Sequence, residues 1–160
     1  MGEMIKVGMA DLKVCRAPDN LTTIGLGSCI GIAVYDPVTK VTGLAHIMLP
    51  DSTAIRNNSN IAKFADTGIK KLIDDMIQMG ASKSRLRAKI AGGAKMFDMG
   101  NNSTMNVGDR NAAACREMLK KLGIPLIAEA CGKNFGRTVE LYSENGDFLI
   151  KAVGKTPYKI

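Results

Sequence analysis

One cysteine set among glycines is the residue of this 160-residue chain best suited to covalent chemistry. Cys29 ends the run TTIGLGSC over residues 22–29, and Gly31 follows it. Glycines let a backbone turn tightly and approach a substrate closely. Successive N–H groups in such a turn can converge on a developing oxyanion. The run therefore predicts a nucleophilic thiol at Cys29, with Gly27 and Ser28 in an oxyanion-binding turn.

Three better-known glycine motifs fit this run less well. A dinucleotide-binding fingerprint needs a third glycine where this chain has Ile30, and it needs a helix where a strand pattern follows. A phosphate-binding P-loop needs a Gly-Lys-Ser/Thr sequence that is missing here. The spacing of Gly27, Cys29 and Gly31 is similar to a nucleophile elbow, but the strand–turn–helix context of that motif is absent.

A thiol is mostly protonated at neutral pH, so Cys29 needs a base. His46 is the only histidine of the chain, and it lies in the strand-like segment 41–49. Strand alternation places His46 on one face with Leu44 and Met48. If segment 30–35 pairs with 41–49, Cys29 lies close to His46. A third group normally orients the base, and the residues alone leave both Thr22 and Thr23 as candidates.

The remaining pattern predicts an α/β (α+β) fold with a mixed sheet in a single domain over residues 1–160. Apolar periodicity predicts helices over 61–79 and from about 111 to 122. We expect strands at 30–35, 41–49, 87–91 and 124–130, and a second hairpin from 137–142 and 147–153 around Asn145-Gly146. The polar segment 49–60 is expected to form a mobile loop beside the site.

The cysteines and the apolar runs indicate a cytoplasmic protein. Cys15, Cys29, Cys115 and Cys131 form no CxxC pair, and we expect four free thiols in a reducing compartment. Cys115 falls in a helical apolar stripe, and Cys15 and Cys131 are expected to be structural. No apolar run is long enough to enter a membrane, and no secretory signal is visible at the N-terminus.

The net charge of +7 raises the question of a nucleic-acid partner. Aromatic residues make up only 4% of the chain, so a stacking platform for bases is not expected, and no nucleic-acid-binding motif is present. A basic surface would also suit an acidic protein partner. We therefore expect no nucleic-acid partner.

Several ordered motifs resemble the chemoreceptor glutamine deamidase family, CheD. They are TIGLGSC at 23–29, GLAHIMLP at 43–50, KIAGGA at 89–94 with Met96-Phe97, NVG at 106–108 with Arg110-Asn111, and the glycine-rich segment 132–137. Together these motifs cover roughly residues 5–153. One departure is visible, because Lys133 stands where a second glycine is expected after Gly132.

The resemblance implies a Cys-His-Thr triad, with Cys29 as nucleophile, His46 as base and Thr23, rather than Thr22, orienting the imidazole. It implies a layered sandwich of mixed β-sheets flanked by helices, similar to toxin-type cysteine deamidases. No cofactor or metal is expected.

The implied substrate is a glutamine on the cytoplasmic helices of a chemoreceptor, and the implied partner is a CheC-type phosphatase. Candidate partner-binding residues are Gly92, Gly93, Met96 and Phe97, although Phe97 could equally fill the core. The alternative is a non-catalytic regulator that binds the receptor or the phosphatase.

Overall fold

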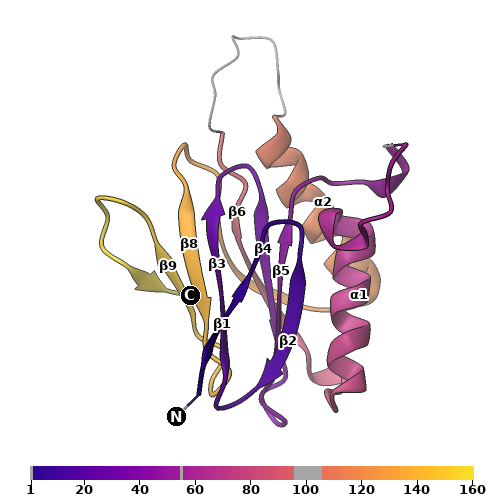
Figure 1. Ribbon diagram of the computed structural model, residues 1–160, viewed down its shortest axis with the longest axis vertical. Helices are drawn as coiled ribbons and strands as arrows, with labels where there is room; N and C mark the ends of the chain where they lie inside the picture. The colour runs from indigo at the N-terminus through magenta and orange to yellow at the C-terminus, as the bar shows by residue number, and fades with distance from the viewer. Residues whose placement is uncertain (1, 55, 96–105) are drawn as a thin grey trace.

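The computed structural model describes residues 2–54, 56–95 and 106–160. Two five-stranded sheets lie face to face, and two helices cover the outer face of one of them (Figure 1). Sheet A has the order β1 (Met4–Val7), β3 (Asn20–Leu26), β8 (Arg137–Leu141), β9 (Phe148–Lys151) and β10 (Tyr158–Lys159). Sheet B has the order β2 (Leu12–Arg16), β5 (Val41–Ile47), β4 (Ile30–Tyr35), β6 (Arg87–Gly92) and β7 (Leu126–Cys131).

Both sheets are mixed, as the sequence predicts. β1 runs parallel to β3 and β6 runs parallel to β7, and the other pairs are antiparallel. The predicted fold class, a layered α+β sandwich, is confirmed. The hairpins β4–β5 and β8–β9 and the strands β6 and β7 are confirmed with small shifts at their ends. Strands β1, β2, β3 and β10 were not predicted.

Alternation along the central hairpin divides the core into two layers. Ile30, Ile32 and Val34 of β4 pack in the cluster under the helices, whereas Ala33 packs in the cluster between the sheets. On β5, Ala45 and Ile47 face the helices and Leu44 faces sheet A. Because side chains alternate along a strand, His46 shares the inner face with Leu44, as predicted.

The first helix is shorter than the sequence indicates. A 3-10 turn, η2 (Ile61–Lys63), is followed by extended backbone at Phe64 and then by α1 (Ala65–Gln78). Phe64 is fully buried and forms a β-bridge with Leu49, which interrupts the helix that apolar spacing alone predicts over 61–79. Two further 3-10 turns are η1 (Ser52–Ala54), within the predicted loop, and η3 (Lys83–Arg85).

The second helix, α2 (Val107–Leu122), begins four residues earlier than predicted. The side chain of Asn106 caps it by accepting a hydrogen bond from the N–H of Asp109, and Gly123 ends it with φ 76°. Asn111 lies on the buried face of α2, together with Cys115 and Leu119. None of the described helices is long and apolar enough to cross a membrane.

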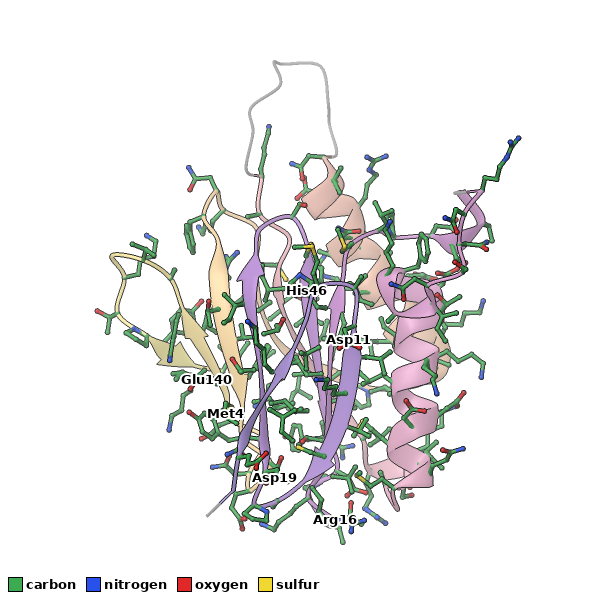
Figure 2. All side chains as sticks on the ribbon, in the orientation of Figure 1. Met4, Asp11, Arg16, Asp19, His46 and Glu140 are labelled. Atoms are coloured by element: carbon green, nitrogen blue, oxygen red, sulfur yellow. The ribbon has the colours of Figure 1, made fainter. Side chains whose placement is uncertain are left out.

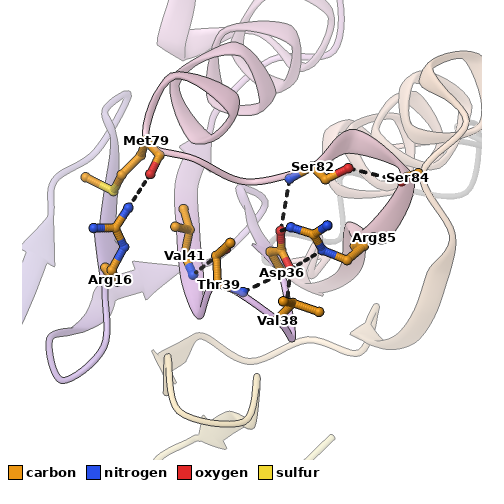
Figure 3. Close-up of polar contacts among 9 residues, drawn as sticks. All are labelled: Arg16, Asp36, Val38, Thr39, Val41, Met79, Ser82, Ser84 and Arg85. Atoms are coloured by element: carbon orange, nitrogen blue, oxygen red, sulfur yellow. Dashed lines mark hydrogen bonds and ion pairs between the residues drawn. The ribbon is translucent and has the colours of Figure 1, made fainter.

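The turn that closes the β4–β5 hairpin is built around a buried carboxylate (Figure 3). Asp36 accepts hydrogen bonds from the N–H groups of Val38, Thr39 and Ser82 and from the guanidinium of Arg85. Beside this cluster the guanidinium of Arg16 donates to the carbonyl of Met79, which ties β2 to the end of α1. These bonds fix the end of the hairpin that lies away from His46.

Candidate functional site

The register of β4 and β5 places Cys29 and His46 on the same face of sheet B. Gly31 lies directly opposite His46. Cys29 precedes Gly31 by two residues and packs in the cluster between the sheets, so it is the diagonal neighbour of His46 on the same face. Gly31 has no side chain to separate them. His46 lies toward one end of the sandwich, opposite the end marked by Arg16 and Asp19 (Figure 2).

Thr23 reaches the same place from the facing sheet. It lies on β3 of sheet A, is fully buried, and places its Oγ1 2.8 Å from Nδ1 of His46. The same hydroxyl donates to the carbonyl of Val7 at 2.8 Å. Thr22, the other candidate, donates instead to the carbonyl of Val139. The structure therefore brings Thr23, and not Thr22, to the imidazole.

The hydrogen bonds of Thr23 determine the tautomer of His46. A hydroxyl carries one proton, and that of Thr23 is directed to the Val7 carbonyl, which can only accept. Oγ1 must then accept the proton of Nδ1, which leaves Nε2 with a free lone pair. Nε2 is buried and has no hydrogen-bond partner in the described part of the chain. An imidazole held in this way could take a proton at Nε2.

Burial keeps both Cys29 and His46 uncharged at rest. Cys29 is 9% exposed, and burial raises the pKa of its thiol above the ordinary value. His46 is fully buried, and burial lowers the pKa of its imidazole. Both shifts disfavour a preformed thiolate–imidazolium pair. The arrangement suits transfer of the thiol proton to the imidazole as the sulfur attacks.

The turn before β4 is held by the chain that follows β6. The Gly27 carbonyl accepts from the N–H of Ala94 at 2.8 Å, and the Cys29 carbonyl accepts from the N–H of Gly93 at 2.9 Å. Gly92 has φ 114°, and a Cβ at this position would lie 2.2 Å from the Cys29 carbonyl oxygen. The close approach of β6 to the turn therefore requires glycine at position 92.

Two N–H groups of this turn are left without a partner. Over residues 2–54, 56–95 and 106–160, neither the N–H of Ser28 nor that of Cys29 donates a hydrogen bond to another protein group. Unpaired N–H groups beside a thiol are the donors that an oxyanion site needs.

The residues predicted to bind a partner are only partly described. Gly92 and Gly93 are buried, and a Cβ on Gly93 would lie 2.9 Å from the carbonyl of Gly108 on α2. Their burial gives these glycines a packing role beside Cys29. Met96 and Phe97 lie outside the described residues. The partner surface stays a prediction.

Two buried polar residues beside the site were named in the sequence only as parts of motifs, with no role predicted for either. Asn111 donates through Nδ2 to the carbonyls of Ser28 and Met48, both at 2.9 Å. Arg137 donates through Nη1 to the carbonyl of Gly132 at 3.0 Å and lies 4.6 Å from the ring centre of Phe135. For Asn111 a signal was present, because it precedes Cys115 and Leu119 at four-residue spacing.

The other three cysteines have no such surroundings. All four cysteines are free, as expected. Cys15 lies within reach of the hydroxyls of Thr42 and Ser143. Cys115 is fully buried on the inner face of α2, and burial raises the pKa of Cys131 to about 11. None of these three lies in a glycine turn beside the histidine.

Comparison with known proteins identifies the family. Residues 48–152 match the family model CheD, described as CheD chemotactic sensory transduction. A protein of Lachnoclostridium phytofermentans named probable chemoreceptor glutamine deamidase CheD is 57% identical over 161 residues, covering 100% of both chains. Proteins of the same name from Caldanaerobacter subterraneus and Moorella thermoacetica are 58% and 52% identical, covering 95% and 98% of this chain and 94% of each relative.

The fold is similar to that of a distant solved protein. The crystal structure of Neisseria meningitidis protein NMB0706, of family DUF152, superposes with a TM-score of 0.51 at 11% sequence identity. The match covers 81% of this chain and 64% of that protein. At this identity the similarity supports the layered α+β fold and nothing finer.

Proposed function

The chain belongs to the CheD family, and we propose that it is a chemoreceptor glutamine deamidase that works through a Cys29 thioester. The names of its relatives support the activity. The observation that carries the mechanism is the hydrogen bond between Thr23 and His46, which leaves Nε2 of His46 free on the face shared with Cys29.

The proposed reaction begins with proton transfer from the Cys29 thiol to Nε2 of His46. The sulfur attacks the carboxamide carbon of a receptor glutamine, and the negative charge that develops on the carboxamide oxygen is met by the N–H groups of Ser28 and Cys29. Protonated His46 then gives its proton to the nitrogen as the C–N bond breaks and ammonia leaves. The product of this half-reaction is a thioester between Cys29 and the receptor side chain.

The second half-reaction returns the enzyme to its starting state. Nε2 of His46 takes a proton from water, and the hydroxide that forms attacks the thioester carbon. The C–S bond breaks, the sulfur recovers its proton from His46, and glutamate remains on the receptor. Thr23 keeps the imidazole in the Nδ1–H tautomer through both steps. No group outside the chain and water is required.

The substrate fixes where the protein would act. The glutamines that would be deamidated lie on the cytoplasmic helices of a chemoreceptor, so the proposal places the enzyme in the cytoplasm. The net charge of +7 suits approach to an acidic helical bundle. The family resemblance adds a CheC-type phosphatase as a second partner.

Mass spectrometry of a purified chemoreceptor cytoplasmic fragment tests the proposal. Incubation with the wild-type protein should convert glutamine to glutamate at specific positions. Cys29→Ala and His46→Gln should each lower the rate by roughly 10³-fold or more, because residues of a catalytic triad act as a unit.

Cys115→Ala is the matched control, because it removes another buried thiol away from the site. It should deamidate the fragment at the wild-type rate. Conversion by Cys29→Ala at that rate would refute the thioester mechanism. If the wild-type protein binds the fragment without converting it, the chain is a non-catalytic regulator instead.

A further inference from the structure

Asn111 is a buried polar residue that no step of the proposed reaction uses. It lies on α2, is fully buried, and donates two hydrogen bonds from Nδ2 to main-chain carbonyls. One carbonyl belongs to Ser28, in the turn that carries the nucleophile. The other belongs to Met48, two residues after the base. One carboxamide thus bridges the two chain segments that must stay in register.

The orientation of this carboxamide follows from its surroundings. Both of its neighbours are carbonyl oxygens, which can only accept, so the NH2 group must face them. Its Oδ1 is buried and has no hydrogen-bond partner in the part of the chain that the structure describes. Leaving a buried acceptor unpaired is unfavourable, and the two donated hydrogen bonds are what the buried carboxamide gains in return.

The bond to Ser28 fixes the direction of the next N–H group. A trans peptide is planar, and its C=O and N–H point in opposite directions. The only cis bond among the described residues is Ala17–Pro18, so the Ser28–Cys29 peptide is trans. Because Asn111 holds the Ser28 carbonyl on the side of α2, the N–H of Cys29 must point away from that helix.

We propose that Asn111 is a positioning residue that holds the Ser28–Cys29 peptide so that the Cys29 N–H is aimed at the oxyanion. The inference rests on the proposed function, because it assumes that Cys29 attacks an amide. The hydrogen bonds of Asn111 go to main-chain carbonyls and not to the reacting sulfur. Asn111 acts through the peptide that it fixes, and the bond to Met48 keeps that peptide in register with the strand of His46.

Two reactions of the same thiol separate this role from general support of the fold. Alkylation of Cys29 by iodoacetamide forms no oxyanion, whereas amide hydrolysis does. Asn111→Ala should lower kcat for the receptor fragment by roughly 10- to 100-fold, with KM unchanged, because an oxyanion donor acts only in the transition state. The alkylation rate of Cys29, followed by peptide mapping, should stay at the wild-type value.

Asn111→Asp gives a second variant that keeps the volume of the side chain, in case the alanine variant folds poorly. Its carboxylate would face two carbonyls, so we expect the same loss of kcat. Cys115→Ala controls for a change on the same buried face of α2 and should leave kcat unchanged.

Two results would overturn the inference. One is a kcat equal to that of Cys115→Ala. The other is a parallel fall of kcat and alkylation rate, which would mean that Asn111 only supports the site as a whole. Neither result touches the proposed function, which fails separately if Cys29→Ala still deamidates the fragment.

Discussion

The two ends of the β4–β5 hairpin treat buried polar groups in opposite ways. At the closed end, the carboxylate of Asp36 is fully buried and accepts bonds from three N–H groups and from Arg85. At the open end, Nε2 of His46 and Oδ1 of Asn111 are buried and unpaired among the described residues. The closed end gains stability from its polar groups, whereas the open end leaves Nε2 of His46 free to take a proton.

The same contrast appears in how each end responds to burial. Burial alone would raise the pKa of Asp36, but the bonds from Arg85 and from the N–H groups of Ser82, Val38 and Thr39 hold it well below its ordinary value. Around Cys29 and His46 burial acts unopposed, so the pKa of the thiol rises and that of the imidazole falls. Substitutions at the Asp36 end of the hairpin should therefore change mainly the stability of the fold. Substitutions at the end with Cys29 and His46 should change mainly the activity.

Removing the compensated carboxylate should have the largest effect on stability. Asp36→Ala leaves the N–H groups of Val38, Thr39 and Ser82 without their acceptor, and we expect a loss of about 3 kcal/mol in the free energy of unfolding. Urea denaturation followed by circular dichroism measures it. Below the unfolding transition, kcat on the receptor fragment should stay at the wild-type value.

The matched control is Asp74→Ala, which removes an exposed carboxylate paired with Lys70 on α1. It should change stability by less than about 0.5 kcal/mol. If Asp36→Ala lowers kcat while the protein is still folded, the two ends of the hairpin do not have separate roles.

The sequence predicts the central elements well because their patterns are strong. The β4–β5 alternation, the Asn145-Gly146 hairpin and the apolar faces of both helices lead directly to the observed elements. Strands β1, β2 and β3 were missed because they mix charged or polar residues with few buried positions, one each in β1 and β2 and three in β3. Pairing within sheet A holds β1 and β3 in place, and pairing with β5 in sheet B holds β2, and no local sequence pattern predicts these contacts.

The site shows the same division between local and long-range information. Cys29 and His46 follow from residue type, glycine spacing and one hairpin register. The choice of Thr23 over Thr22 depends on the packing of β3 against sheet B, and the residues alone left it open until the family resemblance was considered. No role was predicted for Asn111, because an apolar pattern does not mark a polar residue on a buried helix face and its bonds to Ser28 and Met48 join segments far apart in the sequence.

The free energy of unfolding should decrease at acidic pH, because burial lowers the pKa of His46 and no other group offsets this shift. The pKa of His46 is lower in the folded protein than its ordinary value of 6.5. As the pH falls, the imidazole is therefore protonated in the unfolded chain before it is protonated in the folded protein. The free energy of unfolding should decrease below about pH 6.5, by up to about 1.4 kcal/mol per pH unit. His46 is the only histidine, so no other imidazole contributes.

Urea denaturation at pH 7, 6 and 5 tests whether the free energy of unfolding decreases as the pH falls. His46→Gln should have a flatter dependence of stability on pH than the wild-type protein over that range. Equal slopes for the two proteins would show that the imidazole is protonated as easily when folded as when unfolded, which contradicts uncompensated burial.

The smallest predicted effect concerns the turn between β7 and β8, beside the glycines that hold the Cys29 turn. Lys133 stands where the family resemblance leads one to expect glycine, and it adopts φ 64° after Gly132 at φ 86°. A side chain in this left-handed region is strained, whereas glycine is not. Lys133→Gly should therefore raise stability by about 0.5 kcal/mol, after the greater freedom of glycine in the unfolded chain is counted.

Lys120→Gly should have the opposite effect, because it places the same substitution at an exposed position in the last turn of α2. It should lower stability by about 1 kcal/mol. If Lys133→Gly is also destabilising, the Lys133 side chain makes a compensating contact that outweighs its strain.

Deamidation by Lys133→Gly should match the wild-type rate, because the carbonyl of residue 133, which accepts from the N–H of Lys95, is kept. A lower rate would mean that strain in this turn is transmitted through residues 92–95 to Cys29, so that the two ends of the hairpin would differ in strain as well as in hydrogen bonding.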